Sequence, residues 1–171
     1  MISADFVRMM SGYNRWQNES LYRAASTLPD AQRRADRGAF FGSIHGTLSH
    51  LLWGDTIWMS RFDAWDAPEI GIPDSPGWVS DWNDLKGRRA QADARICEWA
   101  ASLTDGRLAG ELSWFSGALQ RDVTHSFALC VTHFFNHQTH HRGQEHAMLT
   151  AGGASPSDTD LFAMPEKRGS G

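Results

Sequence analysis

The chain has 171 residues, of which 41% are hydrophobic and 21% are charged, and its formal net charge is −4. This length supports one well-packed core and is short for two, so we expect one domain over residues 1–165 and a disordered tail over residues 166–171. The Lys and Arg residues are scattered, no secretory signal precedes the first helical pattern, and no run of about eighteen apolar residues occurs, so we expect a cytoplasmic protein with neither a nucleic-acid nor a membrane partner.

The first predicted element is an amphipathic helix over residues 4–25, where apolar side chains recur at spacings of three and four. A second helical pattern begins after Ser43 and continues to about Phe62. Its apolar residues cover more than one face, which predicts a helix that is packed on two sides. Residues 67–77 contain three Pro and two Gly, and this density of helix breakers predicts a surface loop between two helical pairs.

The second half of the chain repeats this arrangement of two long helical patterns. Ser80 is a suitable N-cap for a third helix, which the pattern carries to Leu103 and ends at residues 104–106. Residues 108–123 have a weaker pattern that fits either a short hairpin or an irregular loop, and residues 124–150 predict a fourth helix. Four long helical patterns without a sustained strand pattern predict an all-α four-helix bundle, with a short hairpin before the last helix as an option.

Five of the eight histidines fall within residues 133–146. On an α-helix a step of four residues rotates about 40° and rises about 6 Å, so His137 and His141 project from one stripe, one turn apart. Neutral imidazole nitrogen is a good ligand for zinc and its neighbours in the first transition row, and two such histidines leave room for a third protein ligand and water. His133 paired with His137 is the second choice.

The third ligand must come from another element. His50 shares a helical stripe with small residues, including Gly54, that would let a neighbouring helix approach closely, whereas His45 points to nearly the opposite side. On the predicted fourth helix, His125 lies about 120° around the helix axis from His137 and three turns away, which is too far for one ion. Spacing alone does not separate a metal site from ordinary hydrogen-bonded histidines.

Two motifs resemble those of the DinB-like family of small bacterial proteins, which is distinct from the DNA polymerase sharing that name. The first is NHQTHHRGQ at residues 136–144, and the second, less specific, is LSHLLWGD at residues 48–55. Together with the aromatic N-terminal helix, the resemblance extends over residues 6–153. It implies an up-down-down-up four-helix bundle, commonly a homodimer, and a zinc, nickel or similar divalent ion held by three histidines.

Transferred by position, these ligands are His50, His137 and His141, the set that helical geometry favours. In some relatives the middle ligand is Glu, whereas this chain has His137 there. His140 is expected either to point outward or to support a ligating ring, and Asn136 and Gln144 are candidate supports for those rings. Since protonated imidazole does not bind metal, we expect the ion to be lost below about pH 6.

Three protein ligands leave an open coordination position, as in catalytic zinc sites. Because some members of the family transfer low-molecular-weight thiols, the first hypothesis is a metal-dependent enzyme that activates such a thiol for transfer to a small electrophile. A metal-water hydrolase is the second, with Asp55 or Glu145 as a base approaching from the side. The third is a non-catalytic metal-binding stress protein, and the fourth is nucleophilic catalysis by Cys130.

Overall fold

The computed structural model of the chain describes residues 2–117 and 119–165, and the tail predicted for residues 166–171 lies outside them. In the described part the protein is mostly helical, with one small two-stranded sheet, in agreement with the helical patterns of the sequence. None of its helices combines the length and the apolarity that a bilayer crossing requires.

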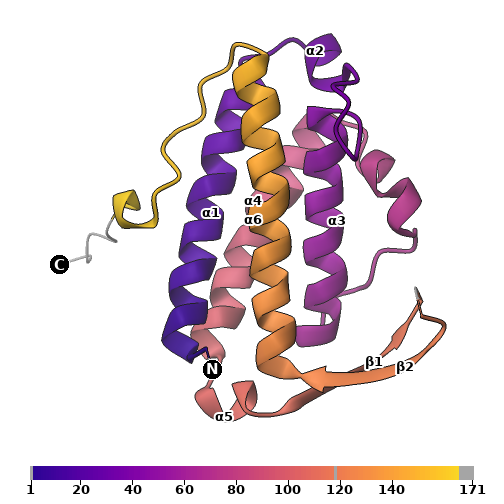
Figure 1. The fold of residues 1–171 in the computed structure, drawn as a ribbon, viewed down its shortest axis with the longest axis vertical. Coiled ribbons are helices and arrows are strands. Elements are labelled where there is room, and N and C mark those ends of the chain that lie inside the picture. Colours follow the sequence, from indigo (N-terminus) through magenta and orange to yellow (C-terminus); the bar gives the residue numbers. More distant parts are fainter. Residues whose placement is uncertain (1, 118, 166–171) are drawn as a thin grey trace.

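Four long helices lie side by side and make up most of the molecule (Figure 1). They are α1 (Ala4–Ser26), α3 (Ile44–Phe62), α4 (Trp82–Ser102) and α6 (Phe127–Ala151). Helices α1 and α3 each pack against both α4 and α6, so all four share one interior. Most residues of α3 are buried, which confirms that this helix is packed on two sides.

Side-chain caps fix where α1, α3 and α4 begin. Ser3 accepts a hydrogen bond from the Phe6 amide, and Ser43 accepts one from the Gly46 amide, so each satisfies a free amide of the first turn. The predicted cap of α4 was wrong by one residue, because Asp81 rather than Ser80 accepts from the Asp84 amide. Both residue types cap well, so the sequence alone did not separate them.

Short elements that the apolar pattern did not predict connect the long helices. They are α2 (Asp30–Arg34), the 3₁₀ turn η1 (Ile72–Gly77), α5 (Asp105–Leu108) and the 3₁₀ turn η2 (Leu161–Ala163). The turn η1 lies within the predicted loop and packs against α3. Helix α5 starts at Asp105, where the third helical pattern was expected only to end, because the Thr104 side chain caps the Arg107 amide.

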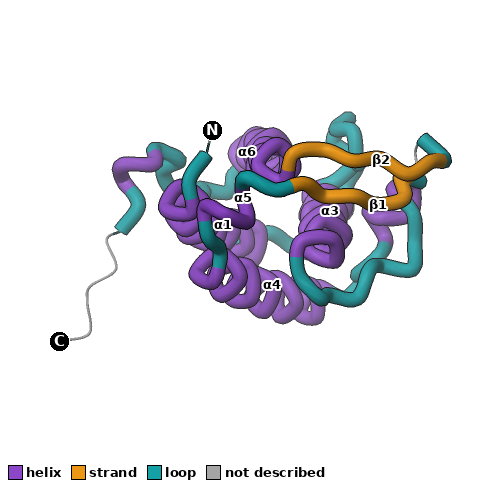
Figure 2. The backbone as a smooth tube through the Cα atoms, turned by 90° about the horizontal axis from the view of Figure 1, so that it is seen from below, coloured by secondary structure: helices purple, strands orange, loops and turns teal. Residues whose placement is uncertain are grey.

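An antiparallel hairpin precedes the last helix and resolves the alternative that the sequence left open. Strands β1 (Glu111–Ser116) and β2 (Arg121–Ser126) pair so that Trp114 faces Val123 in register. Figure 2 shows this hairpin extending from the start of α6 across the end of α3. The last helix therefore begins at Phe127 and not at residue 124, because residues 124–126 belong to the strand ladder.

Stacked and edge-on aromatic rings fill the interior near the hairpin end of the long helices. Phe62 of α3 stacks on Trp99 of α4, with ring centroids 5.5 Å apart, and meets Phe127 and Phe134 of α6 edge-on. Such contacts remove large apolar areas from water and fix the distance between helices. They hold α3 and α6 together at the hairpin end, with Phe62 twelve residues after His50 and Phe134 three residues before His137.

Candidate metal centre

Three histidines from two helices converge between α3 and α6. One nitrogen from each of His50, His137 and His141 lies within 4.8 Å of the others. The Nε2 atoms of His50 and His137 are 3.2 Å apart, and the rings of His137 and His141 have centroids 4.5 Å apart. The convergence predicted from helical spacing is therefore present. We call these three residues the histidine cluster.

A glycine lets the two helices bring these rings together. A Cβ atom on Gly54 of α3 would lie 2.8 Å from Cε1 of His137, so any larger residue there would displace the ring. The spacing prediction that small residues on the His50 stripe allow close approach is confirmed for Gly54. Gly46 on the same stripe serves another contact, since a Cβ there would meet the Phe41 carbonyl oxygen.

Hydrogen bonds to Nδ1 leave the Nε2 lone pairs of two cluster histidines free. The Ser75 hydroxyl donates to the Ile72 carbonyl at 2.6 Å, so at 2.8 Å it accepts from Nδ1 of His50. The amide oxygen of Gln144 likewise accepts from Nδ1 of His141 at 2.8 Å. With Nδ1 protonated, Nε2 of each neutral ring keeps its lone pair, and such partners are what orient metal-binding imidazoles.

Burial keeps the three imidazoles neutral. Loss of hydration, with a smaller contribution from His141, lowers the pKa of His50 to about 4. Burial and then the neighbouring imidazoles lower the pKa of His137 to about 3, and burial also lowers the pKa of His141. No carboxylate belongs to the cluster among the described residues, so no negative charge within it favours the protonated form. Neutral imidazole is the form that binds metal.

The cluster fits a first-row divalent ion such as zinc or nickel. Two nitrogen ligands of one tetrahedral zinc, each bonded at about 2.0–2.1 Å, lie about 3.3–3.4 Å apart. The Nε2 separation of 3.2 Å between His50 and His137 is close to this value. Two lone pairs at that distance repel unless a cation or a proton lies between them. The three histidines are thus placed to hold a metal ion with an open coordination position.

The remaining histidines lie outside the cluster. His45 bonds through Nε2 to the Val79 carbonyl, on the far side of α3, as expected. His140 is exposed, as expected, and contacts Gln144. His133, the second choice, lies against Trp58, with ring centroids 5.0 Å apart. His125 is in β2 beside Trp114 and not on a helix, so the helical reason for excluding it was wrong.

The other supporting residues divide into one that was predicted and two that were not. Gln144 supports His141, whereas Asn136 is exposed and makes no hydrogen bond in the described part of the chain. Ser75 and Phe41 were not foreseen. The Phe41 ring stacks on His50, with centroids 3.6 Å apart, and so covers one side of the cluster. Both residues come from connections between helices, where apolar periodicity gives no signal.

Neither carboxylate considered as a hydrolytic base is available to the cluster. Asp55 forms an ion pair with Arg89 at 2.5 Å and accepts a hydrogen bond from Gln138 at 2.7 Å. Glu145 is fully buried, and burial raises its pKa well above the ordinary value. Cys130 is also buried, and burial raises the pKa of its thiol, which disfavours a nucleophilic role.

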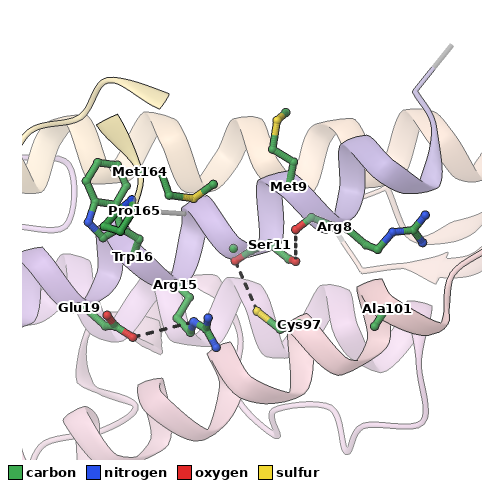
Figure 3. A pocket seen from close by; sticks show the side chains of 11 residues that line it. Arg8, Met9, Ser11, Arg15, Trp16, Glu19, Cys97, Ala101, Met164 and Pro165 are labelled. Atoms are coloured by element: carbon green, nitrogen blue, oxygen red, sulfur yellow. Dashed lines mark hydrogen bonds and ion pairs between the residues drawn. The ribbon is translucent and has the colours of Figure 1, made fainter. Parts of the chain in front are cut away.

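A cavity of about 790 Å³ adjoins the cluster and gives small molecules access to it. His50 and His137 line it together with the indoles of Trp53, Trp58 and Trp114, and Arg61 contributes a charged group. A second cavity of about 560 Å³ lies between α1 and α4, at Ser11 and Cys97 (Figure 3). Its lining contains no histidine, so only the first cavity joins a reactive cluster.

Comparison with known proteins identifies relatives over nearly the whole chain. The model of the DinB family matches residues 3–169. Protein DinB of Bacillus subtilis (strain 168) is 24% identical over 173 residues, which cover 96% of this chain and 97% of that protein. A crystal structure of a DinB-like protein from Bacillus cereus ATCC 10987 aligns with a TM-score of 0.49 and 14% identity, covering 84% of this chain and 90% of that one.

Proposed function

The chain belongs to the DinB family, and from this premise we propose that it is a metal-dependent enzyme that activates a low-molecular-weight thiol for transfer to a small electrophile. The observation that carries the proposal is the histidine cluster, whose three nitrogens lie within 4.8 Å of one another and two of whose residues, His50 and His137, line a large cavity. The four long helices also fit the family's up-down-down-up bundle, since α1 and α6 run one way and α3 and α4 the other (Figure 1).

His50, His137 and His141 would hold a divalent ion, zinc or nickel by the chemistry of the donor set. When bound, such an ion lowers the pKa of a coordinated thiol and stabilises the thiolate. Ser75 and Gln144 fix the direction of two of the three rings, and Phe41 excludes water from one side. His50 and His137 also line the cavity, where the electrophile would lie.

The surroundings of the cluster favour thiol transfer over hydrolysis. Hydrolysis by a metal-bound water is usually assisted by a carboxylate base, and Asp55 is already engaged by Arg89 and Gln138. A thiol needs no such base, because its proton is lost to solvent once the thiolate is stabilised. The sulfur then forms a bond to the electrophilic carbon, and the displaced group leaves with its electron pair.

The test uses protein purified without an affinity tag, analysed for metal and then loaded with zinc or nickel. We expect turnover of a model electrophile such as monochlorobimane with at least one of cysteine, glutathione, bacillithiol and mycothiol. The matched variant His50→Gln should lose this turnover and keep its helical circular dichroism. Metal binding without turnover with any thiol would support a metal-binding protein, and thiol-independent, pH-dependent ester hydrolysis would support a hydrolase. Either result would overturn the proposal.

A further inference from the structure

The cavity beside the histidine cluster has apolar, mostly aromatic walls. Three indoles, Ile57 and Pro73 line it, together with the exposed side chains of Phe115 and Ile72. Trp58 and Trp114 meet edge-on with centroids 5.6 Å apart, so the hairpin and α3 form one continuous aromatic wall. Flat apolar groups pack favourably against such a wall.

One cation lies within these walls without a counter-charge. In the described part of the chain, the Arg61 guanidinium makes no hydrogen bond and no ion pair, and it lies 4.6 Å from the ring centroid of Trp58 and 5.2 Å from that of Trp114. It is half-buried, and burial lowers its pKa, although Arg remains charged at neutral pH. Arg61 has thus lost hydration without gaining an anionic partner.

The arginines of the second cavity, unlike Arg61, have carboxylate partners. Arg8 pairs with Asp5 at 2.7 Å, and Arg15 lies 3.9 Å from Glu19, as the dashed line between them in Figure 3 shows. The lining of the Arg61 cavity, in contrast, contains no Asp or Glu among the described residues. An anion entering that cavity would meet a positive group and no competing carboxylate.

The positions along α3 set the size of the molecule that would fit. His50, Gly54 and Arg61 lie on one face of α3 and all line the cavity. Arg61 is eleven positions after His50, which corresponds to about 16 Å of helix rise. The Arg61 side chain shortens this span, because it folds back along the helix onto Trp58. The shortened span between His50 and the Arg61 guanidinium suits a molecule with an aromatic ring system between its two ends.

We infer that the cavity binds a small carboxylate with a flat apolar body, with its carboxylate on Arg61 and its other end toward the histidine cluster. Arg forms paired hydrogen bonds with planar carboxylates, and the aromatic walls provide apolar contact for the body. A single Arg in an apolar lining suits a singly charged carboxylate better than a doubly charged phosphate monoester. That the carboxylate is a substrate rests on the proposed function, whereas its binding does not.

Metal-free protein, prepared with EDTA, separates this inference from the proposed function. Calorimetric titration compares 2-naphthoate with uncharged 2-naphthamide, which has nearly the same shape. We expect wild type to bind the carboxylate about tenfold more tightly, because one charge-assisted hydrogen-bonded pair contributes roughly this much. Arg61→Met should remove the preference and leave the amide affinity within about threefold. Arg61→Lys should keep part of the preference if Arg61→Met does not fold.

Arg95→Met is the matched control, because Arg95 also stacks on a tryptophan, Trp65, but does not line the cavity. It should keep the full preference for the carboxylate. The inference fails if wild type binds neither probe or shows no preference, if Arg61→Met retains the preference, or if 1-naphthyl phosphate binds more tightly than 2-naphthoate. Loss of thiol-dependent turnover alone would contradict the proposed function and leave this result standing.

Discussion

Two sets of buried residues occupy adjacent positions on α3 and α6, and their polar atoms find partners in different ways. His137 belongs to the histidine cluster, and Gly54 allows its ring to lie close to α3. The next residues, Asp55 and Gln138, belong to a network with Arg89 of α4. One residue along an α-helix turns the side chain by about 100°, so the two groups face different sides of the α3 and α6 contact. We call Asp55, Arg89 and Asp93, with Asn18 and Gln138, the buried ion network.

The difference lies in where the polar atoms find their partners. In the buried ion network, Arg89 pairs with both Asp55 and Asp93, and Asn18 donates to Asp93 at 2.9 Å, so opposite charges pair within the protein. In the histidine cluster the Nδ1 atoms of two rings have partners, while the Nε2 atoms converge. Charges that pair internally stabilise a fold, whereas convergent lone pairs indicate a ligand from outside.

The largest expected effect follows from removing the cation of the buried ion network. Arg89→Met leaves Asp55 and Asp93 buried without their counter-charge, so we expect a loss of about 3–5 kcal/mol in the free energy of unfolding. Urea unfolding of the metal-free protein, followed by circular dichroism, measures it. Arg88→Met is the control, since Arg88 and Asp84 form a half-exposed pair whose loss should cost less than about 1 kcal/mol.

We expect Arg89→Met to have little effect on the zinc affinity of the histidine cluster. Zinc affinity of the folded variant should stay within about threefold of wild type, because Arg89 bonds to no member of the histidine cluster. A loss of less than about 1 kcal/mol in the free energy of unfolding would contradict a stabilising role of the buried ion network. A large loss of zinc affinity at unchanged stability would contradict the separation of this network from the histidine cluster.

The second effect concerns the histidine cluster itself. His50→Gln should lower zinc affinity by more than about 100-fold, because changing even the supporting partners of a ligand typically costs 10–100-fold. Competition with a chromophoric chelator measures the affinity. His45→Gln serves as the control, since His45 is buried on the same helix but bonds to the Val79 carbonyl. If the zinc affinity of His50→Gln stays within tenfold of wild type, α3 does not supply a metal ligand.

A smaller effect is expected from the partner of the His50 ring. Ser75→Ala removes the acceptor for Nδ1, so the ring loses its fixed orientation and zinc affinity should fall by about 10–100-fold. The chelator titration above applies again. Ser60→Ala on α3, where the hydroxyl bonds only to the Ile57 carbonyl among the described residues, is the control and should leave the affinity unchanged. Equal affinities of the two variants would show that Ser75 contributes nothing to orientation.

The parts of the site that lie on long helices could be predicted from the sequence, because helical periodicity fixes which residues share a face. The pair His137 and His141 follows from a spacing of four, and the small residue at position 54 marks the close approach of α3. Ser75 and Phe41 could not be predicted, since their positions depend on the path of connections that have no apolar period. The partner of Asp55, Arg89, likewise lies 34 residues away on another helix.

The errors in the fold have the same origin. Residues 124–126 continue the helical pattern of α6, yet they pair with residues 111–113 in the hairpin, and this non-local ladder overrides local preference. Ser80 and Asp81 are both good caps, and only the three-dimensional start of α4 decides between them. Local signals therefore predicted which long helices exist, whereas the long-range pairing of the hairpin determined where α6 begins.

The smallest effect is a dependence of stability on pH that belongs to the histidine cluster. The pKa of His50 is lowered from 6.5 to about 4 in the folded protein, so between these values the unfolded chain binds more protons than the folded one. The free energy of unfolding of the metal-free protein must then fall as pH decreases through this range. Asp93, whose pKa burial raises to about 6, acts in the opposite sense and belongs to the buried ion network.

Comparing wild type with His50→Gln isolates this contribution, because Asp93 is present in both and cancels in the difference. Between pH 7 and pH 4.5, wild type should lose about 1–2 kcal/mol more unfolding free energy than the variant, after allowing for solvent screening at a partly open site. The lowered pKa values also shift zinc release to below the pH of about 6 that ordinary histidines predict. A constant difference between the two proteins across this range would mean that burial does not keep His50 neutral, and the case for a cluster ready to bind metal would lose its electrostatic support.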